Sequence, residues 1–167
     1  MSNLRLISES SATSVSSLTV TDIFSADFDI YKMTIGNDNT TNNVLKMRFV
    51  NASGSVIATS NYDYANLQLK ADTTFGEDKN VNFTELRGLY EPKEDAYATV
   101  YIFNPYSNSS YTFRLNQQFS YYNTAGMGGK GIGVLKKTDR ITGIHLFKTG
   151  SDFTDITVRT YGLRVDI

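Results

Sequence analysis

The sequence predicts an all-β protein, an antiparallel β-sandwich of jelly-roll type with about ten strands and little helix. Three observations favour this fold class. Aromatic residues that suit strands are abundant, with 11 Tyr and 10 Phe among 167 residues. Short stretches alternate apolar and polar residues, and turn-forming Gly, Asn and Ser separate them at intervals of roughly 10–15 residues. No stretch keeps the helical period over three turns, which argues against helices.

The first part of the chain contains five stretches with strand patterning. A short strand at Leu4–Leu6 and a loosely alternating one at Ser16–Phe24 come first. In Ile30–Ile35 and Val44–Val50 the apolar residues fall on one face and the basic or hydroxyl residues on the other. A short Asn- and Gly-containing connection then predicts a hairpin into Val56–Thr59.

The middle of the chain is less regular. Leu67–Leu69 and Phe83–Leu89 have strand character, and we expect the charged segment Ala71–Asn80 between them to be a loop. Tyr97–Phe103 is apolar or aromatic on both faces. This pattern predicts a central strand that is covered on both sides.

The last third returns to clear alternation. In Tyr111–Asn116, aromatic and aliphatic residues alternate with Thr, Arg and Asn, which predicts a strand with one buried face. Further strands are predicted at Gly131–Leu135, Ile141–Phe147 and Ile156–Thr160. The apolar residues change parity after Gly162, which predicts a β-bulge there.

Length and composition exclude several kinds of chemistry. The length fits a single domain over residues 1–167, with residues 1–17 as a candidate extended N-terminal arm. The chain has no Cys and one His, His145, which excludes thiolate zinc sites, disulfides and multi-histidine metal centres. With a net charge of -1, we expect no nucleic-acid partner. We also expect no cofactor.

Targeting signals are absent from the printed sequence. No apolar stretch of signal-peptide length follows Met1, and no run of about 18 apolar residues occurs. We therefore expect a chain that is made in the cytosol and does not insert into a membrane.

A search for catalytic or metal-binding groups yields weak candidates. His145 lies within a predicted strand and is best interpreted as an ordinary strand histidine. Asp27 and Asp29 are two residues apart, so in a strand their side chains would lie on the same face. This spacing fits a catalytic carboxylate pair or, more simply, the solvated face of a strand at a sheet edge. A Ca²⁺ site at Asn37-Asp38-Asn39 stays open, although the EF-hand pattern is missing. We predict no catalytic, cofactor-binding or metal residue.

The segment Gly126–Gly133 contains a nominal G-x-G-x-x-G pattern. No helix can follow it, because a short strand and a charged turn come next, so a dinucleotide site is excluded. We interpret the segment as a flexible glycine loop that becomes ordered on assembly. Gly126, Gly128 and Gly129 are therefore candidate contact residues.

The excess of tyrosine is the one feature of the composition with functional content, because tyrosine is favoured at binding surfaces. Five tyrosines fall in predicted loops or strand ends, where interface and core are equally good interpretations. These candidate contact residues are Tyr62, Tyr64, Tyr106, Tyr121 and Tyr122.

The C-terminal segments Ile141–Phe147 and Phe153–Val165 resemble the end of many structural proteins of tailed bacteriophages. There, a strand of the type x-I-x-G-I-x-x-F precedes a closing strand of the type I-x-V-[RY]-x-Y-G-[LI]. Val20–Tyr31, Leu45–Gly54 and Ser60–Ala65 are similar to segments of virion proteins of marine phages, cyanophages among them. The resemblance implies a β-sandwich component of the virion, either a capsid decoration protein or a tail-fibre protein.

We therefore expect a non-enzymatic structural protein located in the virion, whose partners are capsid or tail subunits and copies of itself. Strand edges and aromatic loops would bury area against these neighbours. The alternative is a carbohydrate- or receptor-binding module of a tail fibre, in which tyrosine rings would stack on the sugars of a host surface glycan. Head or tail location, copy number and the identity of the neighbour stay open.

Overall fold

The computed structural model describes residues 3–38, 43–72, 75–91, 94–122 and 125–163, and this part of the chain consists of strands and the turns between them. The strands are β1 (Leu4–Val15), β2 (Ser17–Val20), β3 (Ile30–Asp38), β4 (Asn43–Asn51), β5 (Tyr62–Lys70), β6 (Gly76–Phe83), β7 (Leu86–Glu91), β8 (Glu94–Phe103), β9 (Thr112–Tyr122), β10 (Ala125–Leu135), β11 (Ile141–Phe147) and β12 (Phe153–Leu163).

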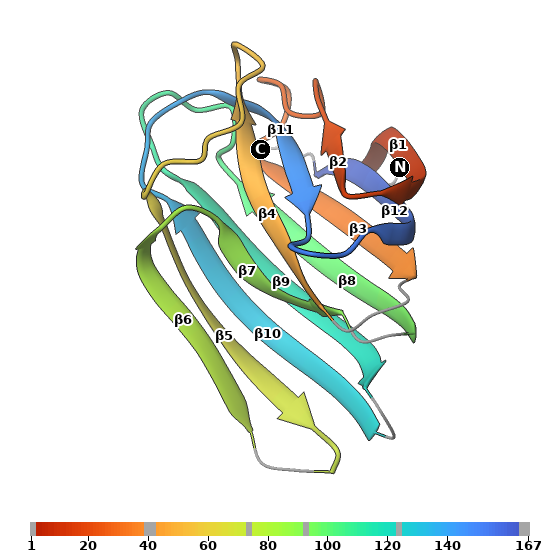
Figure 1. Ribbon diagram of the computed structural model, residues 1–167. Helices are drawn as coiled ribbons and strands as arrows, with labels where there is room; N and C mark the ends of the chain where they lie inside the picture. The colour runs from red at the N-terminus through yellow and green to blue at the C-terminus, as the bar shows by residue number, and fades with distance from the viewer. Residues whose placement is uncertain (1–2, 39–42, 73–74, 92–93, 123–124, 164–167) are drawn as a thin grey trace.

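These strands form two antiparallel sheets that pack face to face as a β-sandwich (Figure 1). The large sheet has eight strands in the order β1-β12-β3-β8-β9-β10-β5-β6, and the small sheet has the order β2-β11-β4-β7. Along the chain, β1 to β4 alternate between the sheets, β7 stays in the small sheet beside β4, and β8, β11 and β12 alternate again, which is the double Greek key of a jelly roll. The predicted fold class is confirmed.

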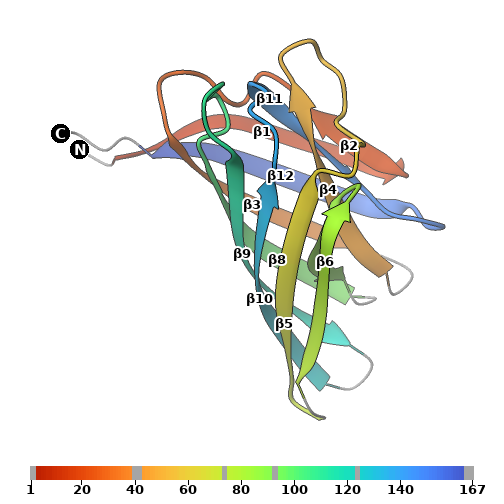
Figure 2. The same ribbon diagram turned by 90° about the vertical axis from the view of Figure 1, so that its left-hand side faces the viewer.

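Two hairpins are inserted into this jelly roll. The hairpin β5–β6 follows β4, the hairpin β9–β10 follows β8, and both add strands to the same edge of the large sheet. In Figure 2 these four strands run side by side and cross the direction of β1 and β12, because the sheet is strongly twisted. The small sheet lies over one part of the large sheet, and the inserted strands extend beyond it (Figure 1).

The hydrophobic core lies between the two sheets. Tyr31, Met33 and Ile35 of β3 are buried against the small sheet, where Met47 and Phe49 of β4 are also buried. Each of these strands alternates apolar and polar residues, so one face can be buried while the other carries Lys, Arg and Thr. The core therefore follows the pattern in these two strands.

Several predicted elements differ from the structure. The segment Ala71–Asn80, predicted as a loop, contains the first part of β6. The glycine segment Gly126–Gly133, also predicted as a loop, lies within β10, which pairs with β9 on one side and β5 on the other. Val56–Thr59 forms only an isolated bridge between Val56 and Val50 instead of a strand.

The two ends of the described chain lie side by side in the large sheet. Residues Leu4–Val15, which belong to the candidate arm, form β1 and pair with β12 from Leu4 opposite Leu163 to Val15 opposite Phe153. The predicted bulge at Gly162 is wrong, because β12 pairs with β3 without a register shift. The irregularity lies in β1 between Leu6 and Ser8.

Candidate assembly surface

The burial pattern of β9 is inverted. Hydrophobic patterning places Phe113 and Leu115 on the buried face, but these side chains are 44% and 41% exposed. Thr112, Arg114 and Asn116, which have the opposite parity, are buried. The predicted strand Tyr111–Asn116 coincides with the first half of β9, but its apolar face points to solvent.

Strand β7 explains why the inner face is polar. It is an edge strand of the small sheet, so the carbonyls on the side away from β4 have no strand partner. The strand packs across β5, β9 and β10 of the large sheet. Side chains of the large sheet supply the donors. Arg114 Nη2 donates to Arg87 O over 2.6 Å, Asn66 Nδ2 to Arg87 O over 3.2 Å, and Asn116 Nδ2 to Gly88 O over 3.4 Å. The polar residues of this parity therefore serve as hydrogen-bond donors to the backbone of β7.

The opposite, solvent-facing side of the large sheet carries the apolar residues. Tyr101, Leu115, Ile132 and Ala65 are successive cross-strand neighbours on β8, β9, β10 and β5. Nine large side chains with at least 41% exposure form a group that we call the apolar face: Leu67, Leu69, Val81, Tyr97, Phe113, Leu115, Phe119, Tyr121 and Ile132. Tyr97–Phe103 was predicted to be covered on both sides, but Tyr97 is half exposed, since nothing in the described chain covers this side of β8.

The apolar face is large for a protein surface. The exposed fractions of its nine members add up to between four and five whole side chains, which is about 800 Å² at roughly 150–200 Å² for each. The largest apolar patch on a typical monomer is about 300–600 Å². Over β8, β9 and β10 the nine residues are not one unbroken patch, because Thr99, Gln117 and Lys130 form a polar row within the face. Their summed exposure is nevertheless large, and exposed apolar surface on this scale is typical of interaction surfaces.

Two hollows lie on this side of the sheet. The first, which we call the apolar hollow, has a volume of about 890 Å³ and is lined mainly by apolar side chains, among them Val81, Phe113, Leu115 and Ile132. The second, which we call the aromatic hollow, has a volume of about 810 Å³ and is lined by side chains that include Tyr97, Thr99, Gln117, Phe119 and Arg159. The face therefore has an apolar end and a mixed aromatic and polar end.

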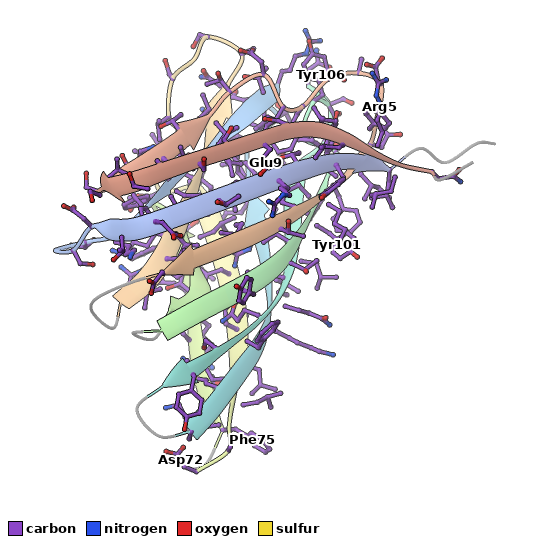
Figure 3. All side chains as sticks on the ribbon, turned by 90° about the vertical axis from the view of Figure 1, so that its right-hand side faces the viewer. Arg5, Glu9, Asp72, Phe75, Tyr101 and Tyr106 are labelled. Atoms are coloured by element: carbon purple, nitrogen blue, oxygen red, sulfur yellow. The ribbon has the colours of Figure 1, made fainter. Side chains whose placement is uncertain are left out.

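Polar strands border the apolar face on both sides. On β1 and β12, Glu9 Oε1 and Arg159 Nη2 form an ion pair at 2.9 Å, and on β6, Glu77 Oε1 and Lys79 Nζ form another at 2.9 Å. Figure 3 shows the large sheet from this side, with Glu9 on β1 and Tyr101 on β8. An apolar centre with a polar rim is the usual anatomy of a protein interface.

Two of the five candidate tyrosines lie in the core. Tyr62 is fully buried, where its hydroxyl accepts from Phe49 N over 3.0 Å and donates to Ile57 O over 2.9 Å. Burial raises the pKa of Tyr62 and raises that of Tyr64 to about 12. Tyr64 is also buried, and its hydroxyl donates to Asp78 Oδ1 over 3.3 Å. Neither residue is available for contact with a partner, which corrects that prediction.

The other candidate tyrosines lie in three different settings. Tyr121 belongs to the apolar face and is half exposed. Tyr106 lies in the turn after β8, where the Arg140 guanidinium lies 4.7 Å from the centre of its ring. Tyr122 ends β9, and its side chain is outside the described part of the structure. Among the candidate tyrosines whose side chains the structure describes, only Tyr121 belongs to the apolar face.

The candidate glycines are strand residues. A Cβ at Gly126 would meet nothing within 4 Å, whereas one at Gly128 would lie 3.4 Å from the Gln118 carbonyl oxygen. Gly129 is buried on the inner face, and a Cβ there would lie 2.9 Å from Gln118 Nε2. Of the three, only Gly129 is closely packed by a neighbouring side chain. All three lie in the paired strand β10, so the interpretation as a flexible loop is wrong.

The exposure of Phe113, Leu115 and Ile132 was not predicted from the sequence. One signal was present in the sequence. In β10, Gly129, Gly131 and Gly133 alternate with larger residues, and glycine repeated on one parity indicates that a neighbour approaches that face closely. The larger residues then occupy the open face.

The weak catalytic candidates lie on different elements and have different partners. His145 lies on the solvent side of β11, where Nδ1 is 2.8 Å from Thr19 Oγ1 and the ring stacks on Phe147. Burial, with a smaller contribution from Arg48, lowers the pKa of His145. Asp27 and Asp29 lie in the turn before β3, and Asp27 Oδ2 accepts from Ser25 Oγ over 3.1 Å. The structure does not bring His145 together with this carboxylate pair.

The described residues contain neither a cluster of metal-binding side chains nor a membrane-spanning helix. No group of three or more His, Asp or Glu side chains is placed to hold a metal ion in this part of the chain. Asn39, part of the calcium candidate, lies outside the described residues. No helix long and apolar enough to cross a membrane occurs among the described residues.

Comparison with known proteins found no matching family model and no matching curated protein. Among solved structures, an exo-inulinase from Aspergillus awamori matches with a TM-score of 0.43 and 11% identity, over 96% of this chain and 29% of that one. A sucrose-6-phosphate hydrolase from Lactobacillus gasseri matches with a TM-score of 0.38 and 10% identity, over 95% of this chain and 28% of that one.

A fructofuranosidase from Schwanniomyces occidentalis gives a TM-score of 0.39 and 7% identity, over 95% of this chain and 34% of that one. This chain therefore spans 28–34% of the length of these three proteins. Similarity at these scores carries no argument about activity.

Proposed function

We propose that this chain is a non-enzymatic structural protein of a bacteriophage virion, a capsid decoration or tail-fibre component that binds neighbouring subunits. The observation that carries the proposal is the inverted burial of β9, which leaves Phe113 and Leu115 on an exposed apolar face. The jelly roll, a fold common among viral capsid proteins, agrees with this role but does not by itself imply it. The resemblance of the C-terminal strands to phage structural proteins supports it independently.

The mechanism is burial of apolar surface against a neighbour. Removing the apolar face from water provides the driving force, and the ion pairs on β1, β12 and β6 remain at the rim. We expected strand edges and the glycine segment to contact neighbouring subunits. In this proposal the apolar face of the large sheet makes these contacts instead. The contact surface is a sheet face, which is broader and more rigid than a loop.

Quantitative mass spectrometry of purified particles tests this function. We expect the chain in every particle at a fixed stoichiometry, in hundreds of copies for a capsid decoration protein and in a few to a few dozen for a tail component. Oxidative footprinting gives a second readout, in which Phe113 and Leu115 should be protected in the particle relative to the free protein at a concentration where it is monomeric. Absence of the chain from purified particles contradicts the proposal.

The aromatic hollow favours a second candidate, carbohydrate recognition. The rings of Tyr97 and Phe119 stack with their centres 5.7 Å apart, and 50% and 64% of the two residues is exposed. Gln117 and Thr99 lie in the adjacent register row, where they can hydrogen-bond to sugar hydroxyls. Exposed rings beside amide and hydroxyl groups suit the apolar face and the polar rim of a sugar.

A glycan array with and without Ca²⁺ tests this candidate, using the wild type, Tyr97→Ala and Phe119→Ala. Specific binding that both substitutions abolish supports recognition at the aromatic hollow. A blank array, or binding that both variants retain, counts against it and leaves assembly as the function.

A further inference from the structure

We infer that two copies of this chain associate through their apolar faces, so that the large sheets pack against each other. The inference rests on the proposed function and identifies the partner of the apolar face as a second copy of the chain. Three properties of the surface support it: its area, its shape and its charge.

The area matches that of a stable dimer. Specific protein interfaces bury about 800 Å² on each partner, and the nine side chains of the apolar face supply about that much before any rim contact is counted. A smaller patch would suit a ligand or a short peptide, whereas this one extends over β5, β6, β8, β9 and β10. A folded domain with a matching broad face is the partner that covers it, and a second copy presents such a face.

The shape of the surface permits two sheets to pack. Side chains on facing sheets interdigitate across a layer about 10 Å thick. The apolar hollow lies beside Ile132, which is 60% exposed, so the surface offers both a recess and projecting side chains. A self-complementary surface needs both, because each copy must fill the recess of the other.

The charges of the surface do not oppose self-association. Lys130 of β10 lies within the face, and its cross-strand neighbours are Gln117 of β9 and Leu67 of β5. Glu77 of β6 is the next neighbour, beside Leu67. Charges of both signs are therefore present in one row, and the chain as a whole carries a net charge of only -1. A face with charges of a single sign would repel its own copy, whereas charges of both signs can pair across an interface.

Sedimentation velocity of the purified protein from low to high micromolar concentration tests the inference. We expect the wild type to form dimers. Ile132→Glu places a carboxylate at the centre of the apolar face, and we expect it to weaken the dimer by at least about tenfold. Ser11→Glu is the matched control, because Ser11 lies on the same side of the sheet on β1, away from the apolar face, and this variant should dimerise like the wild type.

Each outcome is decisive. A wild type that stays monomeric, or an Ile132→Glu variant that dimerises as well as the wild type, overturns the inference. If Ile132→Glu fails to fold, as judged by circular dichroism, footprinting of wild-type Phe113 and Leu115 over the same concentrations replaces it. Protection that does not increase with concentration then overturns the inference.

The failure of this inference is distinguishable from failure of the proposed function. A protein that is monomeric in solution but is found in purified particles, with Phe113 protected there, retains the virion function and loses the self-association. A protein that dimerises through this face but is absent from particles retains the self-association and loses the virion function.

Discussion

At the scale of single residues, Arg114 is the most unusual feature of the interior. Its side chain is 2% exposed, and Nη2 donates to the Arg87 carbonyl, but Nε and Nη1 have no hydrogen-bond partner. Burial lowers the pKa of Arg114. A buried cation without a carboxylate partner lowers the stability of the folded state, since the charge has lost its hydration.

We therefore predict that Arg114→Met stabilises the protein at neutral pH by about 1–3 kcal/mol, because Met fills a similar volume without a charge. The loss of the hydrogen bond to Arg87 offsets about 1 kcal/mol of the gain and is included in that range. Urea denaturation followed by circular dichroism measures the difference. Arg114→Ala is the control and should be destabilised, since it leaves a cavity. A clearly less stable Arg114→Met would show that the guanidinium contributes net stability.

Glu85 lies in the opposite electrostatic situation. Its buried carboxylate receives hydrogen bonds from Arg48 Nη2 at 3.1 Å and Arg87 Nη2 at 3.0 Å, and Lys46 Nζ lies 3.7 Å away. Burial alone would raise its pKa, but the hydrogen bonds from Thr84, Arg87 and Arg48 and the charge of Lys46 outweigh burial and lower it. The folded protein therefore favours the ionised form.

This shift gives stability a definite pH dependence. A carboxyl whose pKa is lower in the folded state contributes stability that is complete above its unfolded value of about 4.5 and is lost as the pH falls through the folded pKa. We predict that Glu85→Gln lowers the free energy of unfolding by about 2–3 kcal/mol at pH 7, with the difference from wild type shrinking as the pH falls below about 4.5.

Denaturation curves at several pH values test this prediction. Glu9→Gln is the control, because its ion pair with Arg159 is exposed and contributes at most about 1 kcal/mol. A constant difference between the wild type and Glu85→Gln over the whole pH range would contradict the assignment.

At the scale of elements, the glycines of β10 determine how closely the inner side chains pack. Gly131 lies under the amide oxygens of Asn66 and Asn116, both of which would contact a Cβ at that position. These asparagines bind the carbonyls of β7, so their displacement also disturbs the packing of the small sheet. The glycine pattern and the polar inner face therefore depend on each other.

We predict that Gly131→Ala lowers the free energy of unfolding by about 1–3 kcal/mol, because buried side chains must move to accommodate the methyl group. Gly126→Ala, in the same strand, should change stability by no more than about 0.5 kcal/mol, since the space there is open. Thermal unfolding of the two variants measures both effects. Equal melting temperatures would contradict the packing role of Gly131.

The sequence predicted the fold best where alternation and burial coincide. The predicted strand Ile141–Phe147 has the bounds of β11, and Val44–Val50 falls within β4, since both strands bury one apolar face. Strand β6 was missed because it is an edge strand with most residues at least partly exposed, so burial imposes no alternation on it. The polar tract of β1 was missed as a strand for the same reason.

The candidate site was less predictable, because burial depends on neighbours distant in sequence. The alternation of β9 predicts a strand but does not show which face another element covers. Here β7 covers the polar face, and this depends on the jelly-roll connection between the sheets. Tyr62 and Tyr64 looked like loop residues because their surroundings are irregular, yet they begin β5 and point into the core.

At the scale of the whole molecule, the two sheets are unequal in size. The small sheet of four strands covers only part of an eight-stranded sheet, and β7 extends the cover with polar contacts to β5 and β9. The outer side of the large sheet is left without a layer in the described chain. The apolar residues on that side are consistent with a molecule whose third layer comes from a partner.

The other edge of the large sheet gives a whole-molecule test. Ile7, Ala12 and Val15 of β1 pack against the core, and the strand covers the edge of β12. Deletion of residues 1–16 removes these contacts and exposes a long strand edge that can pair with other chains. We predict a lower melting temperature and concentration-dependent aggregation, measured by thermal unfolding with light scattering, whereas Glu9→Gln should show neither.

The same deletion separates two roles for this segment. If residues 1–17 act as a contact arm, the truncated protein should melt like the wild type but fail to enter particles. If β1 is a structural edge strand, as its pairing with β12 indicates, stability falls first, and any loss of incorporation follows from it. A truncated protein that keeps the wild-type melting temperature and stays monodisperse would contradict the structural role, because it would show that β12 tolerates an open edge.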